Sequence, residues 1–74
     1  MRHPYYAARL RHAIRSVRSC RALLAEVYAY DPAIATESAM DLVCACRQLH
    51  YWRNAWRGMD ADAAMADAKA KVGL

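Results

Sequence analysis

Apolar side chains recur every three or four residues along residues 1–30, which is the period of one face of an α-helix. Pro4 suits the first turn of this helix. Asp31-Pro32 is expected to end it, because proline disfavours the α conformation in the residue before it. We predict a helix over residues 4–30, roughly 40 Å long at about 1.5 Å per residue. The heptad positions of its apolar seam are Leu10, Ile14, Val17, Arg21, Leu24 and Tyr28.

The next apolar pattern predicts a helix that ends just before Gly58, because glycine is typical of the position beyond a helix end. Two starting points are open. Asp31 can cap a helix that has Pro32 at its first position, or the helix can begin at Thr36–Ser38, where Ser-Ala-Met-Asp resembles a capping box. We predict a helix over residues 32–57 and leave its start open between these two positions.

This second helix is apolar on more than one side. Its main apolar face holds Leu42, Ala45, Cys46, Leu49, Trp52 and Trp56. Met40, Cys44 and Tyr51 lie nearly opposite that face on a helical wheel. A helix that is apolar on several sides is typically buried between neighbours. We expect the first helix to cover one side, and a third helix or a second copy of the chain to cover the other.

A short third helix is predicted over residues 60–72, since Asp60 is a good N-cap and Gly73 a good C-terminal stop. Its apolar stripe is narrow and consists mostly of alanine, and Asp67 and Lys71 have the spacing of an i,i+4 ion pair. Alanine allows close packing but buries little apolar area, so we expect this helix to be the least stable element.

These elements predict an all-α fold: an antiparallel helical hairpin of two long helices plus a short C-terminal helix, in a single domain of residues 1–74. Apolar residues make up 58% of the chain, which is high for so small an interior. We therefore expect a coiled-coil seam that also joins two copies in a homodimer, although a hetero-complex would cover the same surface. The residues expected in the core and dimer seam are Leu10, Ile14, Val17, Leu24, Leu42 and Leu49.

The three cysteines bear on compartment and on metal binding. An odd number of cysteines without a secretory signal favours reduced thiols in the cytoplasm. No run of about 18 apolar residues is present, so we expect no membrane span. Cys44 and Cys46 lack the second ligand pair of a zinc site. A site of Cys46 and His50 with Cys20 or His12 is less favoured than packed thiols, so we expect no metal.

Basic residues concentrate at the start of the chain, whose net charge is +4. Residues 1–25 contain six arginines and no acid. Arg11, Arg15 and Arg18 fall within about 60° of arc on a helix. Such a row can be a solvated face, can meet the acids of a partner protein, or can neutralise the phosphates of nucleic acid. No base-reading motif accompanies it, and the first helix is too long for a helix-turn-helix unit.

The string from Tyr51 to Arg57 is rich in aromatic and basic residues. Trp52 and Trp56 lie one turn apart, and they can either anchor a partner or fill the core at the wide end of the hairpin. Arg53 lies within the apolar face and requires an acceptor if it is buried. Glu26 or an acid of another molecule is the candidate acceptor.

No catalytic or phosphate-binding motif is present, and a chain this small encloses a pocket poorly, so we expect neither an enzyme nor a cofactor. In size, helicity and composition the chain resembles the small helical accessory proteins of phages and mobile elements that bind and inhibit host proteins, such as quorum-sensing anti-activators and anti-CRISPR proteins. The resemblance includes no motif and assigns no residue a role.

The predicted function is that of a basic, non-enzymatic protein-interaction module, a regulator or inhibitor that binds a larger host protein through an acidic surface of that protein. The alternative is a basic helical dimer that binds nucleic acid through the arginines of the first helix. The residues expected to contact the partner are Arg11, Arg15, Arg18, Trp52, Arg53 and Trp56.

Overall fold

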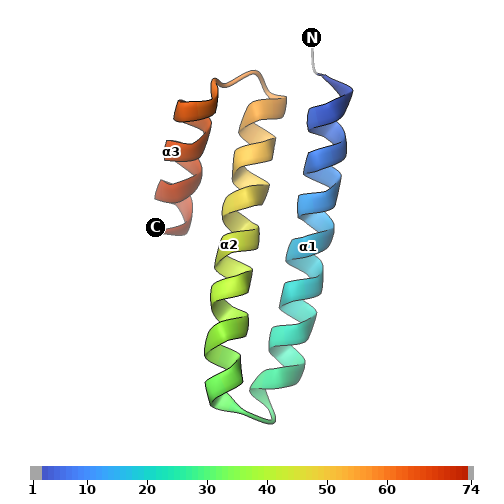
Figure 1. Cartoon of the computed structure of the whole chain (residues 1–74), viewed down its shortest axis with the longest axis vertical. Helices are drawn as coiled ribbons and strands as arrows, with labels where there is room; N and C mark the ends of the chain where they lie inside the picture. The colour runs from blue at the N-terminus through green and yellow to red at the C-terminus, as the bar shows by residue number, and fades with distance from the viewer. Residues whose placement is uncertain (1–2, 74) are drawn as a thin grey trace.

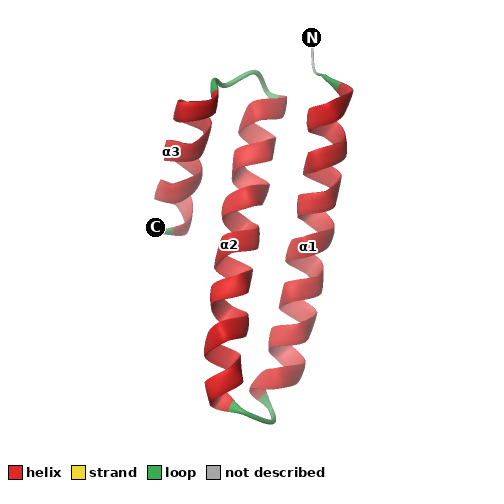
Figure 2. Cartoon of the chain, viewed as in Figure 1, coloured by secondary structure: helices red, strands yellow, loops and turns green. Residues whose placement is uncertain are grey.

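A computed structural model of the chain describes residues 3–73. This part of the chain forms three α-helices and no strand: α1 (Pro4–Tyr28), α2 (Pro32–Trp56) and α3 (Ala61–Val72). The first two helices pack together as an antiparallel hairpin, as predicted, and α3 turns back along α2 (Figures 1 and 2). The helices end within two residues of the predicted bounds; α1 stops at Tyr28 instead of Tyr30.

The three helices lie side by side in a single layer. The Cα atoms span 46 × 22 × 11 Å, so the layer is one helix thick. The central helix α2 packs against α1 on one side and α3 on the other, while α1 and α3 do not pack against each other. Because α3 is short, it covers only the half of α2 that lies away from the hairpin turn (Figure 1). Both broad faces of the layer are therefore exposed.

The start of α2 is decided by Asp31, the N-cap residue. Its side-chain oxygen accepts a hydrogen bond from the backbone N–H of Ala33 at 2.9 Å, with Pro32 at the first position of the helix. The alternative start at Thr36–Ser38 is wrong, because Thr36 already lies inside the helix and its hydroxyl donates to the Pro32 carbonyl at 3.3 Å.

The connection from α2 to α3 depends on Gly58. Its φ of 98° lies in the left-handed region, which glycine adopts without steric cost. The backbone N–H of Gly58 donates to the Ala55 carbonyl and that of Met59 to the Asn54 carbonyl, both at 3.0 Å, which is the Schellman pattern of a helix end. Asp60 then caps α3 through hydrogen bonds from Asp62 and Ala63.

Small residues make up the buried core. The buried apolar residues of residues 3–73 are Ala13, Val17, Ala35, Ala55, Ala64 and Ala68. No large side chain in this range is fully buried. The larger residues of the predicted seam are instead half-buried, namely Leu10, Ile14, Leu24, Leu42 and Leu49.

The seam that α1 presents to α2 is rotated relative to the predicted heptads. Ala13 and Val17 are its buried residues, whereas Arg21 is exposed and the Tyr28 side chain is 72% exposed. The small Ala13 lies at the centre of the contact, and the larger Ile14 beside it is only half-buried. The heptad assignment of Arg21 and Tyr28 to this seam is wrong.

Candidate interaction surfaces

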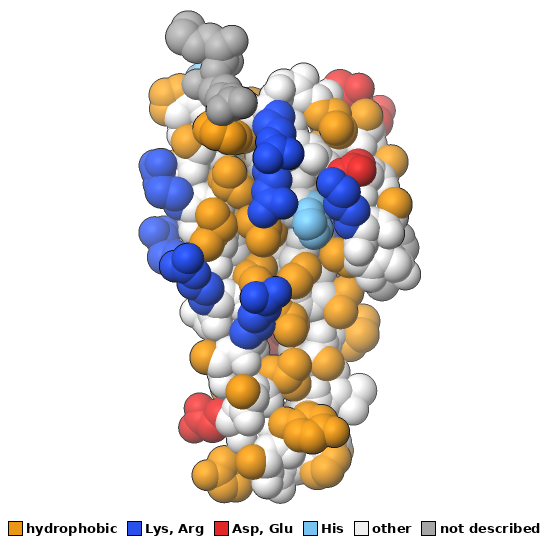
Figure 3. All heavy atoms as spheres, turned by 180° about the vertical axis from the view of Figure 1, so that it is seen from behind, with side chains coloured by type: hydrophobic (Ala, Val, Ile, Leu, Met, Phe, Trp, Pro, Cys, Tyr) orange, Lys and Arg blue, Asp and Glu red, His pale blue; other side chains and the backbone are white. Residues whose placement is uncertain are grey.

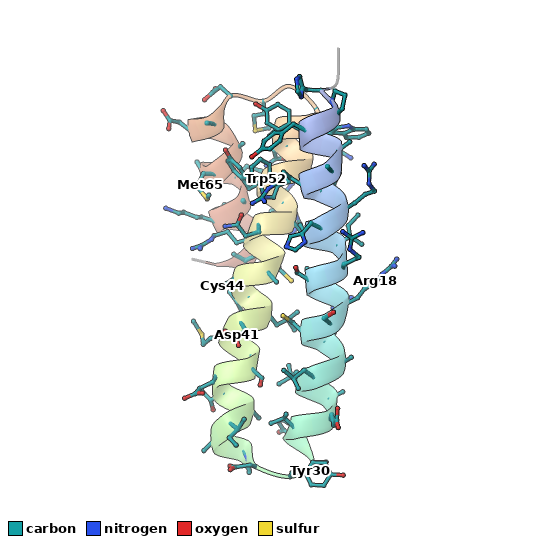
Figure 4. All side chains as sticks on the ribbon, turned by 45° about the vertical axis from the view of Figure 1, so that its right-hand side comes forward. Arg18, Tyr30, Asp41, Cys44, Trp52 and Met65 are labelled. Carbon is teal, nitrogen blue, oxygen red and sulfur yellow. The ribbon has the colours of Figure 1, made fainter. Side chains whose placement is uncertain are left out.

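The first surface is the arginine edge, which we define as Arg11, Arg15 and Arg18. All three side chains are exposed. At about 100° per residue they project roughly opposite to Ala13 and Val17, so they lie on the side of α1 that faces away from α2. Figure 4 shows Arg18 extending outward from the free edge of the layer. The ion pair found among residues 3–73 joins other residues, so no carboxylate of the described chain neutralises this edge.

The second surface is an aromatic cluster at the open end of the hairpin, opposite the turn. The ring of Trp52 lies 6.0 Å from that of Tyr5, 6.2 Å from that of Tyr6 and 4.8 Å from that of Tyr51, measured between centroids. The guanidinium carbon of Arg9 lies 4.9 Å from the Trp52 ring, within the range of a cation–π contact. These contacts join the first turns of α1 to the last turns of α2.

The cluster gives Trp52 a structural role, which is one of the two interpretations that the sequence left open. Trp52 is half-buried, and Tyr5 remains 53% exposed beside it. Arg9 is not among the predicted contact residues, because it lies on another side of α1 than Arg11, Arg15 and Arg18. The spacing of Tyr5 and Arg9, one turn apart on α1, is the signal that could have indicated this cluster.

Arg53 and Trp56 are half-buried on α2, near the same end. The proposed pairing of Arg53 with Glu26 is wrong, because Glu26 lies by the turn and Arg53 lies at the open end of an antiparallel hairpin. The six predicted contact residues therefore do not form one surface. The arginine edge lies on the outer side of α1, and Trp52, Arg53 and Trp56 lie on α2.

A polar cluster joins α2 to α3. The side-chain nitrogen of Asn54, a residue only 4% exposed, donates to Asp67 Oδ2 at 2.8 Å and to the Ala64 carbonyl at 3.1 Å. Asp67 also pairs with Lys71 at 3.1 Å, which confirms the predicted i,i+4 pair. The hydrogen bond from Asn54, followed by that from Lys71, lowers the pKa of Asp67.

His50 borders this cluster. Burial is the main cause that lowers the pKa of His50, and the positive charges of Arg53 and Lys71 lower it further, while Asp67 opposes them. Neither the buried Nδ1 atom of His50 nor the buried Nε atom of Arg47 has a hydrogen-bond partner among residues 3–73. The sequence did not indicate Asn54 as a buried link, since an isolated asparagine carries no periodic signal.

Two grooves flank the contact between α1 and α2. The open-end groove has a volume of about 400 Å³ and is lined by Arg9, His12, Ala13, Ser16, Cys44, Ala45 and Gln48. The turn groove has a volume of about 290 Å³ and is lined by Leu24, Tyr28, Pro32, Ala35, Thr36 and Ala39. Successive residues of an α-helix are rotated by about 100° around its axis. On α2, the residues that line one groove therefore point roughly 180° away from those that line the other, so the grooves open on opposite faces of the layer.

The structure also bears on metal sites and membrane spans. Within residues 3–73 no three His, Cys, Asp or Glu side chains come together in a way that could hold a metal ion. The thiols are free; Cys44 is exposed, and Cys20 and Cys46 are half-buried. No helix in this range combines the length and the apolar character that a bilayer crossing requires.

Comparison of the chain with protein-family models, with curated proteins and with solved structures gives no match. The function proposed below therefore rests on the residues and on the geometry of these surfaces.

Proposed function

We propose that the protein is a small, non-enzymatic interaction module that regulates or inhibits a larger protein, in the manner of phage and mobile-element accessory proteins. Its arginine edge would bind an acidic surface of that protein, in the cytoplasm. The observation that supports this proposal is that Arg11, Arg15 and Arg18 are exposed along one side of α1 and have no carboxylate partner within the described chain.

The arrangement of the arginine edge suits recognition of a rigid acidic patch. Arg11 and Arg18 are about 10 Å apart along the helix axis at about 1.5 Å per residue, and Arg15 lies between them. Guanidinium groups bind carboxylates in a bidentate geometry, and a row of them speeds encounter with an acidic surface. Trp52, Arg53 and Trp56 remain predicted contacts.

Nucleic-acid binding is the second candidate, and the same row of arginines supports it. Evenly spaced cations along a helix can neutralise successive phosphates, whatever the base sequence. This candidate predicts binding to any duplex that weakens steeply as salt rises. The acidic-protein candidate predicts instead a complex that survives nuclease.

The test is purification of the tagged protein from its own host, with and without nuclease, for three forms of the chain. The variant Arg15→Glu/Arg18→Glu reverses two charges of the arginine edge. The matched control, Lys69→Glu/Lys71→Glu, reverses two exposed charges on α3, away from both proposed contact surfaces. A stoichiometric protein that survives nuclease and is lost only in the arginine-edge variant supports the first candidate. Loss of the bound material on nuclease treatment supports the second, and equal binding by both variants contradicts both.

We also propose that the chain forms a homodimer. A layer one helix thick, with no large side chain fully buried in residues 3–73, leaves apolar surface that a second copy would cover. The mass in solution, measured by light scattering across a concentration series, tests this; a monomer throughout contradicts it.

A further inference from the structure

A row of α1 residues at heptad spacing runs beside the contact with α2, on one broad face of the layer. Leu24 and Tyr28 line the turn groove, and steps of seven residues from them reach Leu10, Ile14 and Arg21 on the same side of α1. Val17, the remaining step, is buried at the seam with α2. On α2 the groove residues Thr36 and Ala39 lead in the same way to Val43 and Cys46. We call this side of the hairpin the turn-groove face.

The turn-groove face is large enough for a stable interface. Two helices of 25 residues, each roughly 37 Å long and about 10 Å wide, offer on the order of 700 Å² per copy. Specific interfaces typically bury about 800 Å² per partner. This face presents one row of residues from α1 and one from α2, and two such rows are what one helical hairpin uses to stack on another in a four-helix bundle.

Charge is segregated along the long axis of the hairpin. Residues 22–46, which surround the turn, contain Glu26, Asp31, Glu37 and Asp41 and no Arg or Lys, for a net charge of −4. The rest of the described chain, residues 3–21 and 47–73, contains ten Arg and Lys and three Asp, for a net charge of +7. The view in Figure 3 shows hydrophobic side chains along the whole length of one face, with Lys and Arg confined to the part away from the turn.

We propose that a second copy of this chain packs on the turn-groove face in the antiparallel orientation, so that the acidic turn of each copy lies against the basic end of the other. The inference rests on the proposed homodimer and is independent of the arginine edge. A parallel pair would stack two basic ends and two acidic ends about 8–10 Å apart between helix axes. This is close to the Debye length of about 8 Å at physiological salt, so the repulsion is only partly screened. The antiparallel pair replaces both repulsions by attraction.

The antiparallel orientation also places acidic residues of one copy near the arginines at the end of α2 of the other copy. If two α2 helices cross at their midpoint, residue 44, then residue 57 of one copy lies opposite residue 31 of the other. Arg57 thereby meets an acidic region around Asp31, and Arg53 lies one turn further along. Arg53 is half-buried and forms no ion pair with the described residues of its own chain. An acid of another molecule was one of the two acceptors expected for it.

The orientation is tested by energy transfer between copies. Tyr30 marks the turn and Met59 the open end, and both side chains are exposed. Tyr30→Cys and Met59→Cys are made in a Cys20→Ala/Cys44→Ser/Cys46→Ala background whose helicity is checked by circular dichroism. Singly labelled chains are then mixed. The expected result is efficient transfer between position 30 and position 59 of the partner and weak transfer between the two positions 30, which lie about the length of the molecule apart, 46 Å.

The face is tested by substitutions at two exposed residues near the turn. Tyr28 lies on the turn-groove face, and Leu23, 50% exposed, lies on the other face of α1 as the matched control. Tyr28→Arg, which adds a positive charge opposite the basic end of the partner, is expected to raise the dimer Kd at least tenfold. Tyr28→Glu is expected to raise it less, and Leu23→Arg to change it less than twofold.

The measured mass, the energy transfer and the substitutions test the homodimer, its orientation and its contact face separately. A monomeric mass at all concentrations overturns the homodimer and with it this pairing. A dimer with strong transfer between the two positions 30 overturns the antiparallel orientation and leaves the homodimer standing. A dimer that Leu23→Arg disrupts and Tyr28→Arg does not overturns the choice of face.

Discussion

The side-chain nitrogen of Asn54 on α2 donates a hydrogen bond to Asp67 on α3 at 2.8 Å. It donates a second one to the Ala64 carbonyl at 3.1 Å. The apolar contact of α3 is made largely by Ala64 and Ala68, which are fully buried but small. Because alanine contributes little burial energy, the position of α3 depends strongly on this polar link.

Asn54→Ala should therefore weaken the attachment of α3. The substitution removes a buried donor that serves two acceptors, and we expect the free energy of unfolding to fall by about 1–3 kcal/mol. Urea denaturation measures the loss, and hydrogen exchange should show faster exchange in α3 than in α1. Gln48→Ala is the control, because Gln48 is half-buried on the same helix and makes no side-chain hydrogen bond among the described residues. An equal loss in both variants would contradict a specific link.

Stability should fall on acidification. The pKa of His50 is lowered in the folded protein, first by burial and then by Arg53 and Lys71. The unfolded chain therefore binds the proton more readily, and the free energy of unfolding decreases as the pH falls from the ordinary pKa of histidine towards the lowered pKa of His50. The pKa of Asp67 is lowered as well, so its contribution is present above the ordinary range of aspartate and is lost as the pH falls from that range through the lowered pKa.

Urea midpoints measured between about pH 8 and pH 5 test the histidine part of this prediction. His50→Gln should flatten the profile in that interval. His12→Gln is the control, since His12 is exposed on α1, away from α3, and this variant should keep the wild-type slope. A slope that survives in His50→Gln would show that other groups cause it.

The cap at the hairpin turn should contribute measurably to stability. Asp31→Ala removes the acceptor of the Ala33 N–H, and we expect a loss of about 1 kcal/mol in the free energy of unfolding. Asp41→Ala removes an exposed acid in the middle of α2, where it caps nothing, and should change stability by less than about 0.5 kcal/mol. Thermal unfolding followed by circular dichroism compares the two variants. Similar midpoints for both would contradict the capping role.

The aromatic cluster should hold the open end of the hairpin together. Trp52→Ala removes ring contacts with Tyr5, Tyr6 and Tyr51 and the cation–π contact with Arg9. Since Trp52 is only half-buried, we expect a loss of about 2–3 kcal/mol, below that of a fully buried tryptophan. Near-ultraviolet circular dichroism should weaken, and hydrogen exchange should increase in the first turns of α1.

Tyr30→Ala is the control for the aromatic cluster. Tyr30 is 84% exposed at the turn and makes no ring contact within the described chain. It should change stability by less than about 0.5 kcal/mol. If Trp52→Ala costs no more than this control, the cluster does not stabilise the hairpin.

The sequence by itself determined the three helices and most of their ends, because these depend on local signals. Pro4, Asp60 and Gly73 act on the backbone within one turn of their own positions, so the ends they predicted need no knowledge of the fold. The pair of Asp67 and Lys71 was predictable for the same reason, since helix geometry alone brings residues four apart together.

Only the tertiary structure decided which side of each helix meets its neighbour. Periodicity gives directions around a helix axis, but it did not show that the small Ala13 would be buried while Ile14 stays half-buried and Tyr28 exposed. The antiparallel register separated Glu26 from Arg53, and the return of α3 buried Asn54 against Asp67. These outcomes follow from contacts between residues distant in the chain, where packing of several side chains at once, and not local preference, sets the free energy.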